Sequence, residues 1–399
     1  MKIVQATDRR EFSATRLRAR RTRTLLACLV GALIATACIP RETSQIALTE
    51  EQTISMSGPT WELDYYVNDA YQCGLSGDYS FMVMNPANDP NAEAPLWVYL
   101  HGGGAGYYDD TGTYVAVKTQ TEDTYNHEET FTDLFEDQVV ANSFNTNTNQ
   151  PIDSTLKRRI EEGYRVLAVS LCDHDMFSGL GTPYTNHPTN PNAEVNGLQA
   201  TMAAIDFTAA NYPTTQVWAH GTSAGSIGVW SLASSYGFEG TPLTGVVADS
   251  WIVSPRVETV VDAFGGEPGY PFGPGMKAQG ISDKVGFFAR TDIPAYPEAQ
   301  ITDRDFRSVP VLFIAGNNDP FCGGNQAPLA EAVADGLSNC NWLHDGLRQV
   351  IDAQVDSPHD LHVVNGFGHT PTNEAGPIND VVDAFMADVL ATNPPNFGS

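Results

Sequence analysis

A serine lies at the centre of the motif with the clearest chemistry in the chain. Residues 221–225 are Gly-Thr-Ser-Ala-Gly, the G-x-S-x-G pattern, between a predicted strand over 216–219 and a helix over about 223–235. A tight strand-to-helix turn of this kind strains the serine backbone and exposes its hydroxyl for nucleophilic attack. The small flanking residues allow the strand and the helix to approach closely. The pattern predicts Ser223 as a nucleophile, and a serine at an ordinary turn is the alternative that the motif alone leaves open.

A glycine-rich turn lies upstream of this serine. Residues 101–104 are His-Gly-Gly-Gly and follow a predicted buried strand over residues 95–100. Such turns supply a backbone N–H to the anion that forms when a serine attacks a carbonyl carbon. We expect the N–H groups of Gly103 or Gly104, together with that of Ala224, to bind this oxyanion. A glycine-rich strand end without function is the alternative, and the order of the two motifs along the chain argues against it.

A nucleophilic serine needs a base, and the base needs an acid that orients it. In proteins that use the G-x-S-x-G turn in this way, the chain order is serine, acid, histidine. Asp319 follows a predicted strand over residues 309–315, and His369 follows the last predicted strand, residues 361–364. The carboxyl ends of parallel strands meet at the edge of the sheet where ligands bind. These positions predict Asp319 as the acid and His369 as the base.

Other acids and histidines compete for these roles. Asp249 also ends a predicted strand, residues 243–248, and is the alternative acid. His359 precedes the last strand, at its wrong end, and His362 lies inside that strand, where a packing role is expected. His220 directly precedes the serine turn and is expected to be structural. The remaining histidines lack metal-ligand spacing, and neither H-E-x-x-H nor a paired C-x-x-C occurs, so we expect no metal or other cofactor.

Short apolar strands alternate with helices along the chain, which predicts a mainly parallel sheet with helices on both faces. The fold class expected from this alternation is α/β. The elements not yet named are strands over 79–84 and 164–171 and helices over about 193–211, 327–347 and 377–391.

Two long stretches interrupt this alternation. Residues 107–150 are rich in Thr, Asn and Asp, and residues 251–306 are rich in Gly and Pro. Long segments with weak periodicity inside a compact domain are often functional loops. We expect the first to be a surface excursion and the second to be a lid-like insertion.

The charge of the chain is strongly acidic and unevenly distributed. The 399 residues include 21 Lys and Arg against 48 Asp and Glu, a formal net charge of −27. Residues 1–37 hold eight bases and two acids, so the rest of the chain has 13 bases, 46 acids and a net charge of −33. Contacts to phosphate need a basic surface, so this balance argues against a nucleic-acid partner and against attraction to anionic membranes.

Residues 1–37 have the pattern of an export signal. A basic run over 16–23 precedes thirteen mostly apolar residues, 25–37, whereas a membrane-spanning helix needs about 20. Residues 35–37, Ala-Thr-Ala, fit an ordinary cleavage site, and together with Cys38 they resemble a bacterial lipobox. We favour the lipoprotein, in which membrane attachment occurs only through lipidated Cys38, over a fully secreted form or an uncleaved anchor. All three place the remaining chain outside the cytoplasm.

The domain boundaries follow from these patterns. We expect a signal peptide over residues 1–37, a polar tether over 38–62, and one α/β domain over 63–399.

An exported chain can form disulfides. Four cysteines remain beyond the signal region and the lipidation site, and they allow three pairings. Cys322 and Cys340 are close in sequence and are expected to pair. Cys73 and Cys172 then form the second bridge.

Five short segments share a resemblance in their order and spacing. They are C-G-L-S-G-D-Y over 73–79, L-H-G-G-G over 100–104, L-C-D-H-D-M-F-S-G over 171–179, G-T-S-A-G over 221–225 and A-D-S-W over 248–251. Together they look like the C-x-D-G-S-P-x-x-Y, L-E-G-G-x, Y-C-x-x-x-x-F/W-S-G, G-T/C-S-A-G and A-D-S-G segments of the pectin acetylesterase/Notum family. The members of that family are α/β-hydrolase carboxylesterases.

The resemblance implies the α/β-hydrolase fold with Ser223, Asp319 and His369 as the catalytic triad. It also implies a bridge between Cys73 and Cys172. Family members remove acetyl groups from pectin or an acyl chain from a signalling protein. A net charge of −33 should repel polyanionic pectin, so a neutral acylated polysaccharide or a small ester is at least as well supported.

These observations predict an exported serine carboxylesterase that hydrolyses short-chain acyl or acetyl esters of a small molecule or a polysaccharide. A lipase or polyester depolymerase is one alternative. A non-catalytic surface binding protein on a hydrolase scaffold is the other.

Overall fold

The computed structural model describes the greater part of one α/β domain. The described residues are 42–55, 60–74, 77–86, 89, 91–103, 106–108, 111–116, 144–145, 150–151, 154–184, 186–235, 241–250, 309–319, 341–354, 357–373 and 376–392. Contacts divide the chain into the units Met1–Pro40 and Arg41–Ser399, and every described residue belongs to the second. The predicted signal peptide, the lid-like insertion, and the site residues Cys38, Gly104, Cys322 and Cys340 lie outside the described residues.

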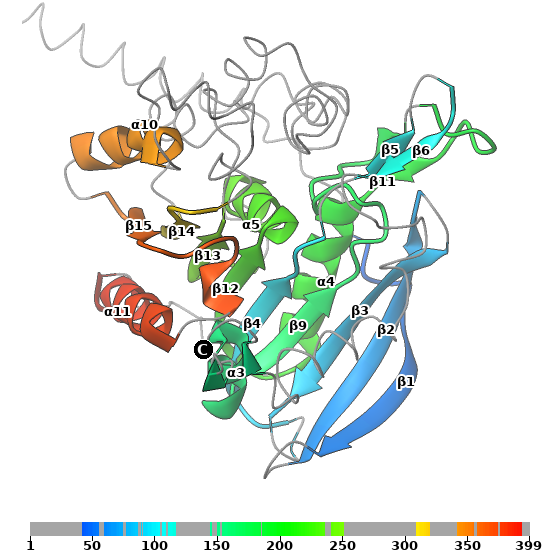
Figure 1. The fold of residues 1–399 in the computed structure, drawn as a ribbon. Coiled ribbons are helices and arrows are strands. Elements are labelled where there is room, and N and C mark those ends of the chain that lie inside the picture. The colour runs from blue at the N-terminus through cyan, green and yellow to red at the C-terminus, as the bar shows by residue number, and fades with distance from the viewer. Residues whose placement is uncertain are drawn as a thin grey trace, which may run out of the picture. The chain divides into compact units, whose positions relative to one another are not determined.

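A nine-stranded sheet runs through the described part of the chain (Figure 1). Its spatial order is β1 (Ile46–Ser55), β2 (Thr60–Gln72), β3 (Asp78–Asn85), β9 (Arg165–Val169), β4 (Ala94–Leu100), β12 (Thr214–Thr222), β13 (Gly245–Asp249), β14 (Val311–Gly316) and β15 (Asp360–Val364). The pairs from β1 to β9 are antiparallel, and all pairs from β9 to β15 are parallel. Every residue of β9, β13 and β14 is buried, as expected for strands covered on both faces. The predicted mainly parallel α/β architecture is therefore confirmed.

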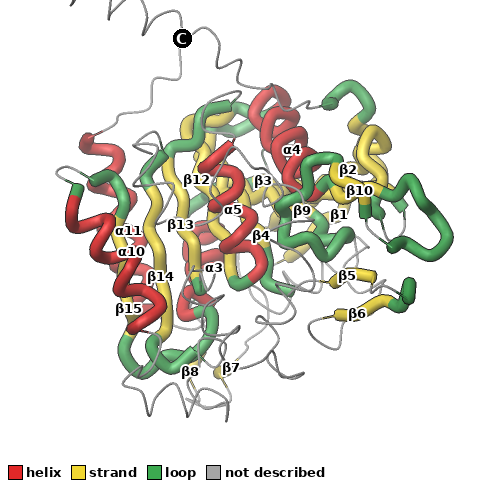
Figure 2. Tube along the Cα trace, turned by 90° about the horizontal axis from the view of Figure 1, so that it is seen from above, coloured by secondary structure: helices red, strands yellow, loops and turns green. Residues whose placement is uncertain are grey.

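Helices cover both faces of this sheet (Figure 2). On one face, Phe385 of the C-terminal helix packs against Trp218 of β12, with the ring centroids 6.4 Å apart. On the other face, Trp230 of the helix after β12 packs against Phe313 of β14, with the ring centroids 5.6 Å apart. The helices are α3 (Thr155–Glu161), α4 (Gly197–Asn211), α5 (Ala224–Ser235), α10 (Asn341–Ala353) and α11 (Gly376–Thr392). None of the helices in the described residues is long and apolar enough to cross a membrane.

The C-terminal helix α11 illustrates how the sequence pattern places a helix. Its buried apolar residues recur three or four positions apart, so they form one stripe that faces the sheet. These residues are Ile378, Val382, Phe385, Met386 and Val389.

Short elements complete the described structure. They are the hairpins β5 (Gly106–Tyr108) with β6 (Tyr114–Ala116), β7 (Phe144–Asn145) with β8 (Gln150–Pro151), and β10 (Thr182–Pro183) with β11 (Glu194–Val195), and the 3-10 helix η5 (Pro371–Asn373). The helix predicted from residue 193 begins four residues later because β11 occupies the start of that segment.

The predicted tether is wrong for residues 46–55, because they form β1 and pair antiparallel with β2. The boundary predicted at residue 63 also falls inside β2. An edge strand is held mainly by backbone hydrogen bonds to a single neighbour, so it can be polar and exposed. Leu48 is 47% exposed, and the acidic residues that follow it suit a solvent-facing edge. The polar composition that indicates a tether therefore fits an edge strand equally well.

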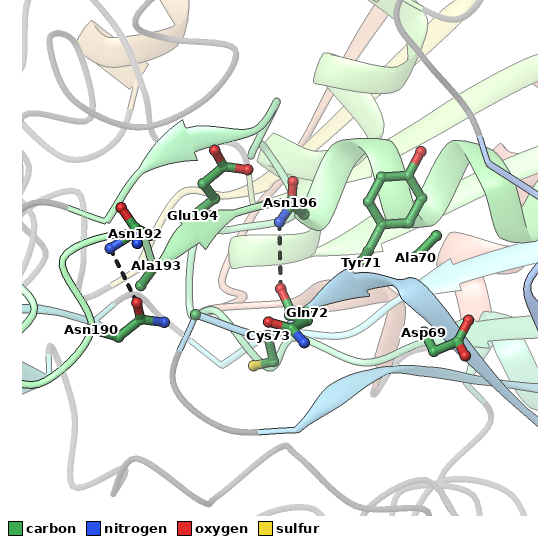
Figure 3. Close-up of a pocket in the computed structure, with 11 residues that line it drawn as sticks. Asp69, Ala70, Tyr71, Gln72, Cys73, Asn190, Asn192, Ala193, Glu194 and Asn196 are labelled. Atoms are coloured by element: carbon green, nitrogen blue, oxygen red, sulfur yellow. Dashed lines mark hydrogen bonds between the residues drawn. The ribbon is translucent and has the colours of Figure 1, made fainter.

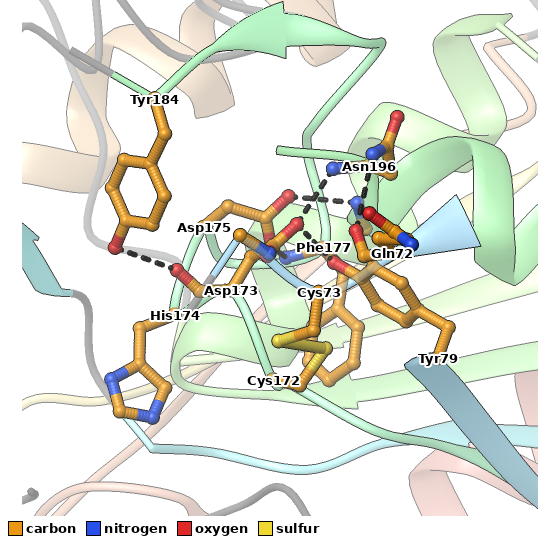
Figure 4. Close-up of a disulfide and its surroundings, with 12 residues drawn as sticks. Gln72, Cys73, Tyr79, Cys172, Asp173, His174, Asp175, Phe177, Tyr184 and Asn196 are labelled. Carbon is orange, nitrogen blue, oxygen red and sulfur yellow. Dashed lines mark hydrogen bonds between the residues drawn. A yellow bond between two sulfur atoms is a disulfide. The ribbon is translucent and has the colours of Figure 1, made fainter. Parts of the chain in front are cut away.

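The predicted bridge between Cys73 and Cys172 is present in the structure (Figure 4). It joins the end of β2 to the segment after β9, with the two Cα atoms 5.8 Å apart. Both cysteines are buried and pack in a cluster with Tyr71, Tyr79 and Ala203. The disulfide thus attaches the antiparallel part of the sheet to the parallel part.

Two buried acidic residues lie just after Cys172, and the first of them, Asp173, reinforces this attachment. Asp173 accepts hydrogen bonds from Tyr79 Oη at 2.5 Å, from Asn196 N at 2.7 Å, and from the N–H of Gly74. Asp175 lies against the N-terminus of α4 and accepts from three backbone N–H groups, those of Phe177, Gly179 and Gly197. Burial raises the pKa of Asp173 to about 8 and that of Asp175 to about 6.

Removing the disulfide is expected to lower the free energy of unfolding by about 2–5 kcal/mol, since it closes a long loop of the unfolded chain. The two cysteines are 99 residues apart in sequence. We expect the double variant Cys73→Ala/Cys172→Ala to unfold at a lower urea concentration than the wild type, measured by circular dichroism. Reductant should destabilise the wild type more than it destabilises this variant. Equal urea midpoints for the two proteins without reductant would contradict the prediction.

Candidate active site

The carboxyl ends of four adjacent parallel strands lie at one edge of the sheet. Ser223 directly follows β12, Asp319 follows β14, and His369 follows β15. The strand between β12 and β14 ends at Asp249, the alternative acid. Parallel sheets bind ligands at this edge. The fold therefore brings the three predicted catalytic residues to strand ends on the same side of the sheet.

Ser223 forms the tight turn between β12 and α5. Its φ of +53° lies in the left-handed region, a strained conformation for a residue with a side chain. Its N–H donates to Asp249 O at 3.0 Å. A Cβ at Gly221 would overlap the carbonyl of Gly225, and one at Gly225 would overlap the carbonyl of Leu100, so both positions need glycine. Ser223 is 4% exposed, and its Oγ has no hydrogen-bond partner among the described residues.

The glycine-rich turn after β4 approaches this serine closely. A Cβ added to Gly102 would lie 3.1 Å from Ser223 Cβ, so a larger residue would push the two turns apart. The next residue, Gly103, is buried in the same turn. Ala224 is the first residue of α5, where backbone N–H groups have no partner within the helix and the helix dipole favours negative charge. Gly103 and Ala224 are thus on the two turns that meet at Ser223.

His101, the first residue of the glycine-rich turn, has a structural role. Its Nδ1 lies 2.7 Å from Gly102 O, and because a carbonyl can only accept, Nδ1 is the protonated nitrogen. The ring packs against Phe177, with the ring centroids 5.7 Å apart. Burial lowers the pKa of His101 to about 4, so the ring is neutral near pH 7.

His369 and Asp319 form a hydrogen-bonded pair. His369 Nδ1 donates to Asp319 Oδ2 at 2.7 Å. The Asp319 side chain is 2% exposed and that of His369 is 15% exposed. In a serine–histidine–acid triad, this bond fixes the ring orientation and the tautomer in which Nε2 is the basic nitrogen. The two residues predicted as acid and base are thus hydrogen-bonded to each other, and their roles stay a prediction.

Two asparagines outside the predicted site hold the loops of this pair together. Asn317 Oδ1 accepts from Gly366 N at 2.8 Å, and its Nδ2 donates to Asn365 Oδ1 at 2.9 Å. Asn318 N donates to Phe367 O at 2.9 Å. No local pattern in the sequence indicates these contacts, which join residues about 50 positions apart.

Asp249, the alternative acid, has different partners. Its carboxylate accepts from Thr372 N at 2.9 Å, from Thr372 Oγ1 at 2.5 Å, and from Ser250 Oγ at 3.1 Å. The carboxylate hydrogen-bonded to His369 is that of Asp319. Burial raises the pKa of Asp249 to about 6, and the hydrogen bonds from Thr372 oppose this rise.

The three histidines that compete with His369 lie where packing roles are expected. His220 is fully buried, its ring centroid is 5.5 Å from that of Trp97, and its Nε2 lies 3.0 Å from Thr372 Oγ1. Burial lowers the pKa of His220 to about 3. His359 is buried ahead of β15, and His362 pairs with Ile314 inside the sheet.

One cavity of about 380 Å³ lies beside the disulfide (Figure 3). It is bordered by the end of β2 and by the loop that leads into β11, and Asn196 Nδ2 donates to Gln72 O at 3.4 Å between the two. Its side chains are mainly amides and carboxylates, among them Asp69, Gln72, Asn190, Asn192, Glu194 and Asn196. None of the predicted catalytic residues lines it.

The described residues contain one group whose atoms are close enough to hold a metal ion, formed by Cys73, Cys172 and Asp173. The two sulfur atoms of this group are bonded to each other, so they are not thiolate ligands.

The parallel strands β9 to β15, the serine turn with left-handed backbone after β12, and the candidate acid and histidine that follow later strands are the arrangement of the α/β-hydrolase fold. The chain has the α/β-hydrolase fold.

No family model matches the chain, and no curated protein matches its sequence. The chain is similar to an S-formylglutathione hydrolase from Agrobacterium tumefaciens, at 11% identity and a TM-score of 0.42, over 86% of this chain and 98% of that one. It is also similar to a bacterial heroin esterase, at 13% identity and a TM-score of 0.37, over 93% and 90% of the two chains.

A thermostable esterase from Pseudomonas putida is a third similar structure, at 15% identity and a TM-score of 0.37, over 92% and 86% of the two chains. At these identities and TM-scores, the similarities assign no activity to this α/β-hydrolase.

Proposed function

We propose that this α/β-hydrolase is a serine carboxylesterase. The observation that carries the proposal is the 2.7 Å hydrogen bond between His369 Nδ1 and Asp319 Oδ2, at the same sheet edge as the strained Ser223 turn. A carboxylate, an imidazole and a serine hydroxyl on neighbouring strand ends are the groups that acyl transfer requires. The buried Ser223 Oγ accepts and donates no hydrogen bond among the described residues, so it is free of the local bonds that would oppose its role as the nucleophile.

In the proposed mechanism, Ser223 Oγ attacks the ester carbonyl carbon while His369 Nε2 takes the serine proton. Collapse of the tetrahedral intermediate breaks the bond to the alcohol, which receives that proton from His369 and leaves. Water then attacks the acyl-enzyme while His369 Nε2 takes a proton from it. Collapse of the second tetrahedral intermediate breaks the bond to Ser223 Oγ, which receives that proton from His369, and the carboxylic acid is released. Asp319 keeps the ring oriented and stabilises its cationic form throughout.

The carbonyl oxygen gains negative charge at each tetrahedral intermediate. We assign its stabilisation to the N–H groups of Gly103 or Gly104 and of Ala224. The support for this assignment is the close approach of the glycine-rich turn to Ser223 and the place of Ala224 at the start of α5. Fixed backbone donors in a site that excludes water are effective because they need no reorganisation during the reaction. This scheme uses no metal or cofactor.

We further propose that the enzyme is related to the pectin acetylesterase/Notum family and acts on short acyl groups. The five resembling segments support this, and the bridge from Cys73 to Cys172 joins the first of them to the third. The net charge of −33 beyond residue 37 favours a neutral acylated polysaccharide or a small ester over pectin, because like charges repel.

A series of p-nitrophenyl esters from acetate to palmitate tests the proposed acyl length. We expect kcat/KM to be highest for acetate or butyrate and to fall with longer chains. A preference that rises with chain length would instead support a lipase or polyester depolymerase. Acetylated xylan and acetylated pectin, assayed in parallel by acetate release, separate neutral from anionic polymers, and we expect faster release from xylan. Faster release from pectin would contradict the charge argument.

A further inference from the structure

Three residues with left-handed backbone lie at the proposed active edge. Ser223, Ser250 and Thr370 have φ values of +53°, +62° and +54°. Such values are uncommon for residues with side chains, and they are most unfavourable for a β-branched residue such as Thr370. Strained conformations of this kind persist only when the surrounding bonds fix them.

The segment Asp249–Ser250 is bonded to both of the other strained turns. Ser223 N donates to Asp249 O at 3.0 Å, which fixes the serine turn. Thr370 N donates to Ser250 Oγ at 2.7 Å, which fixes the loop immediately after His369. Ser250 N donates to Ile314 O at 2.8 Å, so the segment is also anchored to β14, the strand that leads to the acid. One short segment therefore contacts the elements that carry all three proposed triad residues.

The Asp249 carboxylate holds the histidine loop at a second point. Its Oδ2 accepts from both Thr372 N and Thr372 Oγ1, and its Oδ1 accepts from Ser250 Oγ. The single hydroxyl hydrogen of Thr372 is used in the bond to Asp249, so His220 Nε2 must donate in its 3.0 Å contact with Thr372 Oγ1. Asp249, Thr372, Ser250 and His220 are all fully buried. Because water cannot replace these bonds, each of them constrains the loop.

We propose that Asp249 is a positioning residue. It acts through Thr372 and Ser250 to fix the position of the His369 loop relative to the turn of Ser223. This inference rests on the proposed function. Asp319 orients the imidazole ring, whereas Asp249 fixes the backbone on which that ring is carried. The two carboxylates thus have separate roles, whereas the sequence predicts a single acid.

Loss of the bonds between Asp249 and Thr372 or Ser250 is expected to displace the base, His369. Displacement of a catalytic group by about 1 Å can lower the rate by about 100-fold. The contacts that bind substrate are not removed, so kcat should fall while KM changes little. Replacing a residue that only stabilises the fold would lower the melting temperature without this effect on kcat.

The test compares two variants at one position. Thr372→Val removes the hydroxyl that bonds Asp249 and keeps the side-chain size, and Thr372→Ser keeps the hydroxyl. We expect Thr372→Val to lower kcat by about 10- to 100-fold, and to slow labelling of Ser223 by a fluorophosphonate in proportion. Thr372→Ser should stay close to the wild type in both measurements. Ser250→Ala removes the acceptor of the Thr370 N–H and should also lower kcat and slow the labelling. This variant replaces Thr372→Val in the test if Thr372→Val does not fold.

Leu63→Ala serves as the control for stability. Leu63 is fully buried in β2, at the opposite end of the sheet from β15, so the variant should lower the melting temperature and retain kcat well below that temperature. The proposal is overturned if Thr372→Val or Ser250→Ala retains wild-type kcat, or if Leu63→Ala loses kcat as they do.

A second readout separates this proposal from the proposed function. If the wild type neither hydrolyses esters nor reacts with the fluorophosphonate, the esterase assignment is wrong. Hydrogen exchange in residues 365–373, measured by mass spectrometry, then still tests the anchoring of the loop. We expect faster exchange there in Thr372→Val than in Thr372→Ser, and equal exchange in the two would overturn the proposal.

Discussion

Replacing Ser223 by alanine is expected to lower kcat for p-nitrophenyl acetate by about four to six orders of magnitude. The reason is that Ser223 supplies the oxygen that bonds to the acyl group, and water at the same place lacks both its position and its contact with the base. The measurement is steady-state hydrolysis by purified wild type and Ser223→Ala at equal concentrations. Circular dichroism should show that the variant remains folded.

Ser231 offers a matched control on the helix that follows the serine turn. It is a buried serine of α5, and its Oγ donates to Ile227 O at 2.9 Å within the helix. Ser231→Ala is expected to keep kcat within about a factor of three of the wild type, since the removed bond lies away from the serine turn. Equal losses in the two variants would mean that the effect of Ser223→Ala is structural, and the proposed role of Ser223 would be wrong.

Replacing Asp319 by asparagine is expected to lower kcat by about 10⁴-fold, a loss of the size seen when the acid of a triad is neutralised. Asp319 accepts the Nδ1–H of His369 at 2.7 Å. An asparagine can present its NH₂ group to the ring instead, which favours the wrong tautomer, and it cannot stabilise the imidazolium by charge.

The same substitution at Asp249 is the matched comparison. Both aspartates are buried, and they follow or end neighbouring strands. Asp249→Asn removes the same charge but leaves the His369–Asp319 bond in place, so we expect a loss of only about 10- to 100-fold. The reverse order of effects would make Asp249 the acid of the triad and contradict the assignment of Asp319.

The elements that carry the proposed triad could be predicted because each has a strong local pattern. β13 and β14 are buried on both faces and therefore appear as continuous apolar runs. The serine turn follows from Gly221 and Gly225, whose close contacts exclude any larger residue. Asp319 and His369 could be predicted because each follows an apolar strand within a few residues, and parallel strands bring their carboxyl ends to one edge.

The features that could not be predicted depend on contacts between distant parts of the chain or on exposed backbone. Thr372 and Asp249 are 123 positions apart, and no periodicity links them. β1 is an exposed edge strand, so its composition does not distinguish it from a tether. The export signal over 1–37, lipidation at Cys38, the Cys322–Cys340 pair and the Gly104 N–H fall outside the described residues, and each of them stays a prediction.

The central claim is that Ser223 is the nucleophile of an esterase, and reaction with a fluorophosphonate tests it most directly. Intact-mass measurement of the wild type should show one adduct per chain, and peptide mapping should place the adduct on Ser223. Its accumulation should match the loss of p-nitrophenyl acetate hydrolysis, and Ser223→Ala should stay unlabelled. An active wild type that remains unmodified, or that carries the adduct on a different residue, would contradict the account.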